Sequence, residues 1–224
     1  MLLSHSRKFI YLKTRKTAGT SVEIFFEPWC LPDTGQHAEK HAIAETVSDA
    51  GIVGSRTRTG APVHRFYNHM PASEVRSAVG REIFDAYFKF CVVRNPFDKI
   101  VSAFWWRQSR RNPHWEALAA ANFGDVRIAF SQFVRTARLP IDKDIYAIDG
   151  AIAVDEFIRY ESLEADLTRI CARLGIDSSN RTLGVYKGGV RSRPEPYRDY
   201  YDPESAGIVR DVYAWDIQQL GYAF

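Results

Sequence analysis

The chain has 224 residues, of which 46% are hydrophobic and 25% are charged, and its formal net charge is +3. A chain of this length and composition can bury a substantial core, and a charge this mild gives no indication of a nucleic-acid-binding protein. We therefore expect one globular domain over residues 1–224, and the lack of an apolar leader or membrane span in the sequence predicts a cytoplasmic location.

An anion-binding loop is the first prediction along the chain. Residues 9–12 form an apolar run that is typical of a short buried strand, and residues 22–26 fit a helix. The basic loop between them, residues 13–21, places backbone N–H groups and the positive end of the helix dipole where an anion would bind. Lys16 adds a positive charge, although this lysine precedes Gly19 and so makes no Walker A motif. A plain basic loop capped by serine and threonine is the alternative.

The stretch up to residue 68 has poor periodicity. Residues 37–49 fit one helix, and residues 51–60 are typical of a mobile basic loop. Because long irregular stretches in compact domains are usually functional or disordered, we expect residues 28–68 to form a substrate-binding or lid segment. Residues 72–79 then predict a helix that ends at Gly80.

A second strand-to-helix junction follows at residues 88–102. Residues 88–93 are the clearest strand in the sequence, and Asn95 is a good cap for the helix that begins after it. The junction places Arg94 at the carboxyl end of the strand and Ser102 one turn beyond Asp98, where ligands of open α/β sheets gather. A salt bridge for Arg94 and a hydroxyl bonded to its own helix for Ser102 are the structural alternatives.

The same helix carries a basic and aromatic surface that includes Trp106, Arg107 and Arg110. Arginine can pair with carboxylate or sulfate groups while an indole ring covers a sugar face, so this surface could bind an acidic sugar chain. A solvated basic face above core tryptophans, Trp105 among them, explains the same pattern equally well.

The rest of the chain alternates strand and helix signals. Residues 151–160 predict a strand region, residues 161–174 and 203–220 predict helices, and residues 187–193 form a flexible basic loop suited to closing over a phosphate. This alternation predicts a layered α/β domain with a mainly parallel central sheet flanked by helices. The cysteines lie far apart and fit buried reduced thiols, with no cysteine–histidine cluster that would indicate a metal; they are Cys30, Cys91 and Cys171.

Both junctions together resemble the sulfotransferases that use 3′-phosphoadenylyl sulfate (PAPS). Residues 16–21 look like the 5′-phosphosulfate loop of that family, and residues 94–102 look like its 3′-phosphate motif. The resemblance is closest to the carbohydrate-type branch, whose animal members sulfate heparan and chondroitin, and to its bacterial relatives. It covers nearly the whole chain outside residues 28–63 and implies a P-loop-like three-layer fold. Arg15 stands where many members have proline.

The resemblance implies in-line sulfuryl transfer from PAPS to a hydroxyl group, with a carbohydrate as the expected acceptor, adenosine 3′,5′-bisphosphate as the product and no metal. Lys16 would then stabilise the leaving oxygen. The implied donor-binding residues are Arg15, Lys16, Thr17, Ala18, Gly19, Thr20, Ser21, Arg94, Ser102 and Arg191. The implied acceptor-binding residues are Trp106, Arg107 and Arg110. Peripheral membrane contact and the oligomeric state are left open.

His69 is the predicted general base, because related sulfotransferases carry a histidine there and the pKa of histidine lies near neutrality. A histidine that caps the following helix or is satisfied in the core is the alternative, and His64 and His41 are reserve candidates. Two other functions compete with sulfuryl transfer: a P-loop-type kinase, for which no Walker lysine is visible, and a non-catalytic glycan-binding protein.

Overall fold

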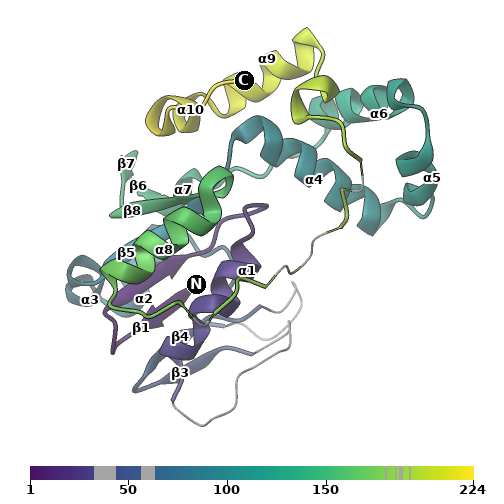
Figure 1. Cartoon of the computed structure of the whole chain (residues 1–224). Helices are drawn as coiled ribbons and strands as arrows, with labels where there is room; N and C mark the ends of the chain where they lie inside the picture. Colours follow the sequence, from purple (N-terminus) through teal and green to yellow (C-terminus); the bar gives the residue numbers. More distant parts are fainter. Residues whose placement is uncertain (33–43, 57–63, 180, 185, 187–188, 192) are drawn as a thin grey trace. The chain divides into compact units, whose positions relative to one another are not determined.

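The computed structural model describes residues 1–32, 44–56, 64–179, 181–184, 186, 189–191 and 193–224 (Figure 1). Two compact units make up this part of the chain. Unit 1 comprises residues 1–93 and 142–186, and unit 2 comprises residues 94–141 and 187–224. The predicted lid segment lies partly outside the described residues, which stop at residue 32, resume at 44 and stop again at 56.

Unit 1 contains a six-stranded sheet among its described residues, in the order β3-β4-β1-β2-β5-β8. The strands are β1 (Leu2–Ser4), β2 (Phe9–Leu12), β3 (Thr46–Ser48), β4 (Gly51–Val53), β5 (Phe88–Val93) and β8 (Glu156–Arg159). β2, β5 and β8 run parallel, whereas the β1–β2, β1–β4 and β3–β4 pairs are antiparallel. The α/β class is confirmed, but the sheet is mixed rather than mainly parallel. The short turn between β1 and β2 requires antiparallel pairing, because parallel strands need a long crossover.

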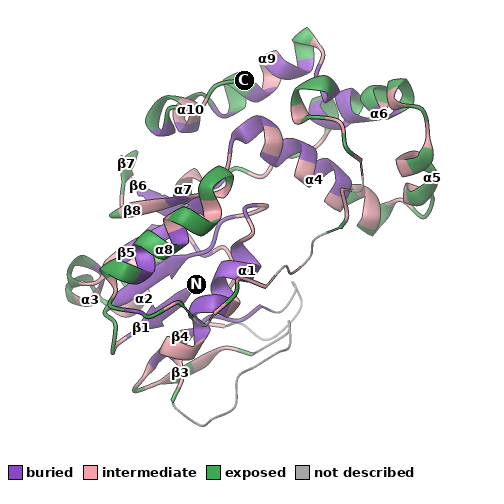
Figure 2. Cartoon of the chain, viewed as in Figure 1, coloured by how far each residue is buried: buried purple, intermediate pink, exposed green. Residues whose placement is uncertain are grey.

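The central strands β2 and β5 are buried on both faces, which explains their continuous apolar sequence. Phe9, Tyr11 and Phe90 pack in one core cluster with helices α1 (Gly19–Phe26) and α8 (Leu163–Arg173). The alternate side chains Ile10 and Cys91, which point to the opposite face, are also fully buried. Figure 2 shows these strands in the colour of buried residues, so the two strand ends that precede the predicted loops rest on a rigid base.

The remaining elements of unit 1 include two departures from the sequence predictions. The elements are η1 (Glu27–Cys30), α2 (Ala72–Val79), α3 (Arg81–Ala86), α7 (Lys143–Tyr146), β6 (Ala147–Ile148), β7 (Ala151–Ile152) and η2 (Tyr160–Ser162). α2 ends at Gly80, as predicted. The strand region at residues 151–160 is split, because β7 pairs with β6 and only β8 joins the main sheet.

The prediction of a helix at residues 37–49 is wrong for its last residues, which form β3 and pair with β4 as an antiparallel hairpin. Residues 37–43 lie outside the described part of the chain. Gly51 allows β4 to pair with β1, because a Cβ atom at this position would lie 2.0 Å from the carbonyl oxygen of Leu3 on β1. Pairing with a distant strand, and not local propensity, therefore decides the structure here.

Unit 2 is helical in its described residues. Its elements are α4 (Pro96–Arg111), α5 (Trp115–Ala120), α6 (Phe123–Thr136), η3 (Tyr197–Tyr200), α9 (Pro203–Val212) and α10 (Ala214–Leu220). The Asn95 side chain caps α4 by accepting from the Phe97 N–H at 3.0 Å, as predicted. The single helix predicted at residues 203–220 is broken at Tyr213, whose hydroxyl donates to the Pro140 carbonyl at 2.7 Å.

Two further sequence predictions concern the whole chain. Cys30, Cys91 and Cys171 are buried and unbridged, which confirms the prediction of structural thiols. Within the described ranges, the longest helices are too short or too polar to cross a membrane.

Candidate functional site

The loop after β2 has the backbone geometry of an anion cradle. Lys16 has a φ of 62° and Ala18 a φ of 58°, so two left-handed residues alternate with their neighbours just before α1. Such alternation turns successive N–H groups toward one side. Gly19 is required by close approach, since a Cβ there would lie 3.0 Å from the Thr14 carbonyl oxygen. The first turn of α1 holds no acidic residue that would offset the positive end of its dipole.

Two threonines tie the base of this loop to the sheet. The Thr14 hydroxyl donates to the Val92 carbonyl near the end of β5, and it lies 2.7 Å from the Thr17 hydroxyl. Because the single proton of Thr14 goes to Val92, the Thr17 hydroxyl must donate to Thr14. The Thr17 side chain, buried in this contact, is therefore a structural element of the loop.

The Ser21 hydroxyl connects α1 to a later segment of unit 1. It accepts a hydrogen bond of 3.2 Å from the N–H of Tyr186. A serine hydroxyl that accepts from a backbone amide keeps its own proton for another acceptor. Ser21 can thus donate to an anion while it anchors residue 186, the last described residue before the predicted basic loop.

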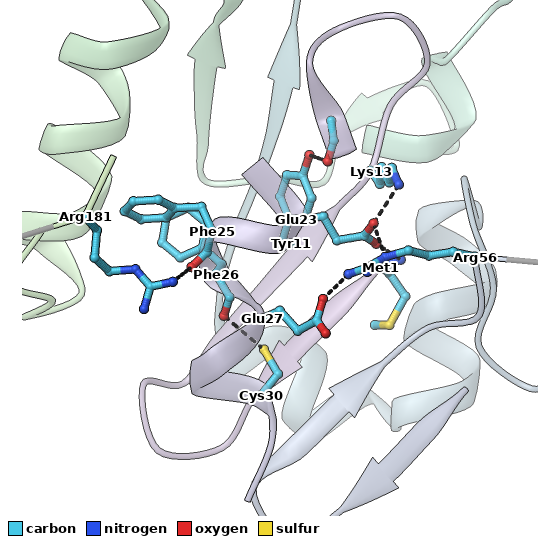
Figure 3. A network of polar contacts seen from close by, with 11 residues as sticks. Met1, Tyr11, Lys13, Glu23, Phe25, Phe26, Glu27, Cys30, Arg56 and Arg181 are labelled. Atoms are coloured by element: carbon cyan, nitrogen blue, oxygen red, sulfur yellow. Dashed lines mark hydrogen bonds and ion pairs between the residues drawn. The ribbon is translucent and has the colours of Figure 1, made fainter. Parts of the chain in front are cut away.

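A buried charge network lies beneath the loop (Figure 3). Lys13 Nζ donates to Glu23 Oε2 at 2.6 Å, and Arg56 Nε donates to the same oxygen at 2.7 Å. Arg56 also pairs with Glu27, the first residue of η1, directly after α1. Burial by itself would raise the pKa of Glu23, but attraction to Lys13 and Arg56 outweighs it and lowers the pKa to about 2. Glu23 is therefore ionised at neutral pH and fixes Lys13 as a structural cation.

This network was not predicted from the sequence. Glu23 lies on α1 and Glu27 begins η1 four residues later, among mostly apolar neighbours, and two buried carboxylates need cations beside them. Neither Lys13 nor Arg56 was identified from the sequence as a partner of Glu23, and Arg56 lies 33 residues away from it.

Arg15 is held by a second buried carboxylate. Its backbone N–H donates to Asp142 Oδ2 at 2.9 Å, and its Nη1 donates to Asp142 Oδ1 at 2.9 Å. The Asp142 side chain is 2% exposed, whereas that of Arg15 is 39% exposed. Asp142 thus fixes the backbone of the loop one residue before Lys16 and leaves part of the Arg15 side chain in solvent.

The structure brings His69 to the base of the same loop. Its Nδ1 lies 3.0 Å from the Lys13 carbonyl oxygen, which can only accept, so Nδ1 carries the proton and Nε2 has the lone pair. Burial lowers the pKa of His69 to about 4, although the hydrogen bond to Lys13 acts in the opposite direction. At neutral pH the imidazole is therefore neutral and can accept a proton at Nε2.

Of the two reserve candidates for the general base, the structure describes only His64. His64 Nδ1 lies 3.5 Å from Glu45 Oε2, and His41 lies outside the described residues.

In unit 2, Arg94 and Arg191 share one carboxylate. Arg94 Nε donates to Asp98 Oδ2 at 2.7 Å, and Arg191 Nη1 donates to Asp98 Oδ1 at 2.7 Å. Ser102 lies half-buried on α4, one turn after Asp98. The predicted salt bridge for Arg94 thus exists, and it includes a second arginine that the sequence had placed in a different loop.

The basic and aromatic surface of α4 is only partly as predicted. Arg110 lies over the Trp106 ring at 4.6 Å and Arg107 over the Phe133 ring at 5.9 Å; both arginines are exposed, and Trp106 is half-buried. Trp105 is a core residue, and its indole N–H donates to the Tyr200 hydroxyl at 3.2 Å. Trp106 and Arg110 therefore form a surface pair above a buried tryptophan, which combines the two alternatives drawn from the sequence.

A search of the described ranges for three or more histidine, cysteine, aspartate or glutamate side chains that could hold a metal ion finds none.

Comparison with known proteins gives one family match and three individual similarities. The model of the Sulfotransferase family matches residues 1–223. An uncharacterized protein of Archaeoglobus fulgidus is 27% identical over 110 residues, which is 48% of this chain and 83% of that protein.

The other two similarities are to solved structures. Mouse sulfotransferase SULT7A1 complexed with PAP is 17% identical, with a TM-score of 0.47 over 96% of this chain and 86% of that one. A sulfotransferase from Alicyclobacillus acidocaldarius is 13% identical, with a TM-score of 0.39 over 97% and 96% of the two chains.

Proposed function

We propose that this chain, which belongs to the sulfotransferase family, moves a sulfuryl group from PAPS to an acceptor hydroxyl on a carbohydrate. The observation that carries the proposal is the loop before α1. Its left-handed residues Lys16 and Ala18 and its acid-free helix start suit a multiply charged anion. His69, the neutral base that the reaction needs, lies against the carbonyl of Lys13 in the same unit.

The residues present fit the 5′-phosphosulfate end of the donor. Backbone N–H groups at residues 17–21 and the hydroxyl of Ser21 would bind the 5′-phosphate. The Thr17 hydroxyl is left out of this set, because it already donates to Thr14. Arg15 adds positive charge at the edge of the loop through its partly exposed side chain.

The reaction is an in-line exchange of one S–O bond for another. Bound PAPS would supply an activated sulfuryl group, whose bond to the bridging oxygen of the 5′-phosphate breaks as a bond to the acceptor oxygen forms. Lys16 stabilises the negative charge that grows on that bridging oxygen, which keeps the electron pair. His69 Nε2 takes the proton of the acceptor hydroxyl. The products are a sulfate ester and adenosine 3′,5′-bisphosphate.

Residues of unit 2 are proposed to bind the 3′-phosphate of the donor and the acceptor. Arg94, Ser102 and Arg191 would bind the 3′-phosphate, which distinguishes PAPS from other adenine nucleotides. The Trp106–Arg110 pair supports an acceptor that offers a sugar face and an acidic group, as the carbohydrate-type branch of the family uses.

A nucleotide-binding comparison tests the proposal. Adenosine 3′,5′-bisphosphate at about 100 times its Kd should raise the Tm by about 5–10 °C, because this excess adds about 2.7 kcal/mol of stability. Adenosine 5′-phosphate at the same concentration, which lacks the 3′-phosphate, should give a clearly smaller rise. An equal or larger response to ATP would instead favour the kinase alternative. A screen of labelled sulfate transfer from PAPS to glycans, lipids and small alcohols would identify the acceptor.

Replacing Asp142 with alanine should weaken the binding of adenosine 3′,5′-bisphosphate about tenfold, the size expected when a charged group that orders two hydrogen bonds is lost. The change removes the acceptor of the Arg15 N–H and loosens the loop next to Lys16. Isothermal titration calorimetry measures the effect. Asp144→Ala is the matched control, since Asp144 is exposed on α7 two residues away. Equal affinities of the two variants would contradict the role given to Asp142.

A further inference from the structure

We infer that Asp98 is a positioning residue that holds Arg94 and Arg191 together as one 3′-phosphate clamp. This inference rests on the proposed function. It assigns a role to a carboxylate that would otherwise be expected only to complement the dipole of α4. The three residues belong to unit 2, although Asp98 and Arg191 are 93 positions apart in the sequence.

The first argument is geometry. Both Arg94 Nε and Arg94 Nη2 approach Asp98 Oδ2, at 2.7 and 2.6 Å, which fixes the plane of the guanidinium group. Asp98 Oδ1 accepts from Arg191 Nη1 at 2.7 Å. One carboxylate thus uses its two oxygens on two different arginines, and it sets their separation as well as their orientation.

The second argument is that Arg191 is supported from further sides. Its Nη2 donates to the Glu195 carbonyl at 2.8 Å, and its guanidinium lies 5.5 Å from the centre of the Tyr200 ring. The Asp98 contact therefore completes a set of three contacts that hold the head of a long, flexible side chain. A side chain ordered in advance loses less entropy when it binds an anion.

The third argument is charge. Two guanidinium groups and one carboxylate leave a net charge of +1, so the cluster remains attractive to a phosphate. The side chains of Arg94 and Asp98 are 8% and 16% exposed, and contacts of this burial are screened less by salt than surface pairs are. Without the carboxylate the two cations would repel each other, and the more exposed Arg191 would move away.

A competing reading is that Asp98 occupies the place of the phosphate and must be displaced by it. The two roles predict opposite effects of removing the carboxylate. A positioning Asp98 helps a 3′-phosphate to bind, whereas a competing Asp98 hinders it. A role in folding alone would alter the binding of all nucleotides alike.

The experiment compares two ligands in calorimetric titrations of the full chain. Adenosine 3′,5′-bisphosphate carries the 3′-phosphate, and adenosine 5′-phosphate does not. For Asp98→Ala, the Kd of the bisphosphate should rise about tenfold, as expected for the partial loss of a charge-assisted contact, while the Kd of the monophosphate stays within about twofold. In turnover, KM for PAPS should rise while kcat changes little.

Two further variants serve as controls for Asp98→Ala. Asp85→Ala removes the carboxylate of the exposed pair between Arg81 and Asp85, which has the same spacing on α3, and it should change neither Kd. Asp98→Asn keeps the shape of the side chain and should fall between the wild type and Asp98→Ala, which covers the case that the alanine variant folds poorly.

Three results would overturn the inference. Tighter binding of the bisphosphate by Asp98→Ala would assign the competing role. Equal weakening of both ligands would assign a folding role. A wild-type protein that binds the two ligands equally would overturn the 3′-phosphate assignment of the proposed function, and the inference with it.

Discussion

Replacing Lys16 with alanine is expected to lower kcat by about 10²–10³-fold, the usual cost of removing one group that stabilises charge in a transition state. Lys16 is the proposed partner of the bridging oxygen, on which negative charge grows only as the bond to sulfur breaks. The loss should therefore appear mainly in kcat, and the Kd of adenosine 3′,5′-bisphosphate should change by less than about tenfold. Stopped assays of PAPS turnover and calorimetry of the product nucleotide measure the two quantities.

Lys8 provides a matched control for this experiment. Both lysines have a left-handed backbone, with φ of 50° at Lys8 and 62° at Lys16, and Lys8 is exposed in the turn between β1 and β2. Because alanine keeps the Cβ atom, each substitution leaves the backbone strain nearly unchanged. Lys8→Ala should keep full activity, and Lys16→Arg should recover part of what Lys16→Ala loses. A Lys16→Ala variant with near-normal kcat would remove this residue from the mechanism.

The parts of the fold that the sequence predicted correctly have local signals. β2 and β5 are continuous apolar runs, and the start of α4 is marked by Asn95 followed by Pro96. Capping and burial depend on neighbours in the sequence, so these elements could be read from short windows. The loop between β2 and α1 belongs to this class, because its glycine, its lysine and its hydroxyl residues are adjacent.

The parts that were missed depend on distant partners. The β4 strand of the β3–β4 hairpin joins β1 because Gly51 can approach the carbonyl of Leu3, and nothing near residue 51 specifies that contact. Similarly, Asp142 lies 127 positions from Arg15, and the buried pairing of Arg56 with Glu23 joins the segment after β4 to helix α1. A short window of sequence does not indicate which distant charged side chain will form an ion pair with a given residue.

His69 shows the same difference between what local sequence indicates and what a distant partner determines. The resemblance to known sulfotransferases suggested His69, but no sequence pattern indicates its tautomer or its protonation state. Both follow from the Lys13 carbonyl, 56 positions away, and from burial of the ring. The structure thereby gives the candidate histidine a neutral charge state and a nitrogen that can accept a proton, and its proposed role can be tested through pH.

Replacing His69 with alanine is expected to lower kcat about 10²–10⁴-fold, the range for loss of a general base, while the Kd of adenosine 3′,5′-bisphosphate stays within about threefold. His64→Ala is the comparison variant, since His64 pairs with Glu45 and is the reserve candidate for the base that the structure describes. Near-normal turnover of His69→Ala, or an equal loss in the His64 variant, would show that another group accepts the proton.

The pH dependence provides an independent test of the same assignment. The folded pKa of His69 is lowered to about 4, so its base form persists well below neutral pH, and kcat/KM for the free enzyme should fall only below about pH 5. The phosphates of bound PAPS would add negative charge beside the imidazole and raise its pKa, so the acid limb of kcat should lie at a higher pH than that of kcat/KM.

The same shift makes a prediction for stability. Between about pH 6.5 and pH 4 the unfolded chain binds a proton at residue 69 that the folded chain does not, so this histidine makes the protein less stable as the pH falls through that window. His69→Gln should flatten the dependence there, which urea unfolding at several pH values would measure. An unchanged slope, together with coincident acid limbs of kcat and kcat/KM, would mean that His69 does not titrate as its burial requires.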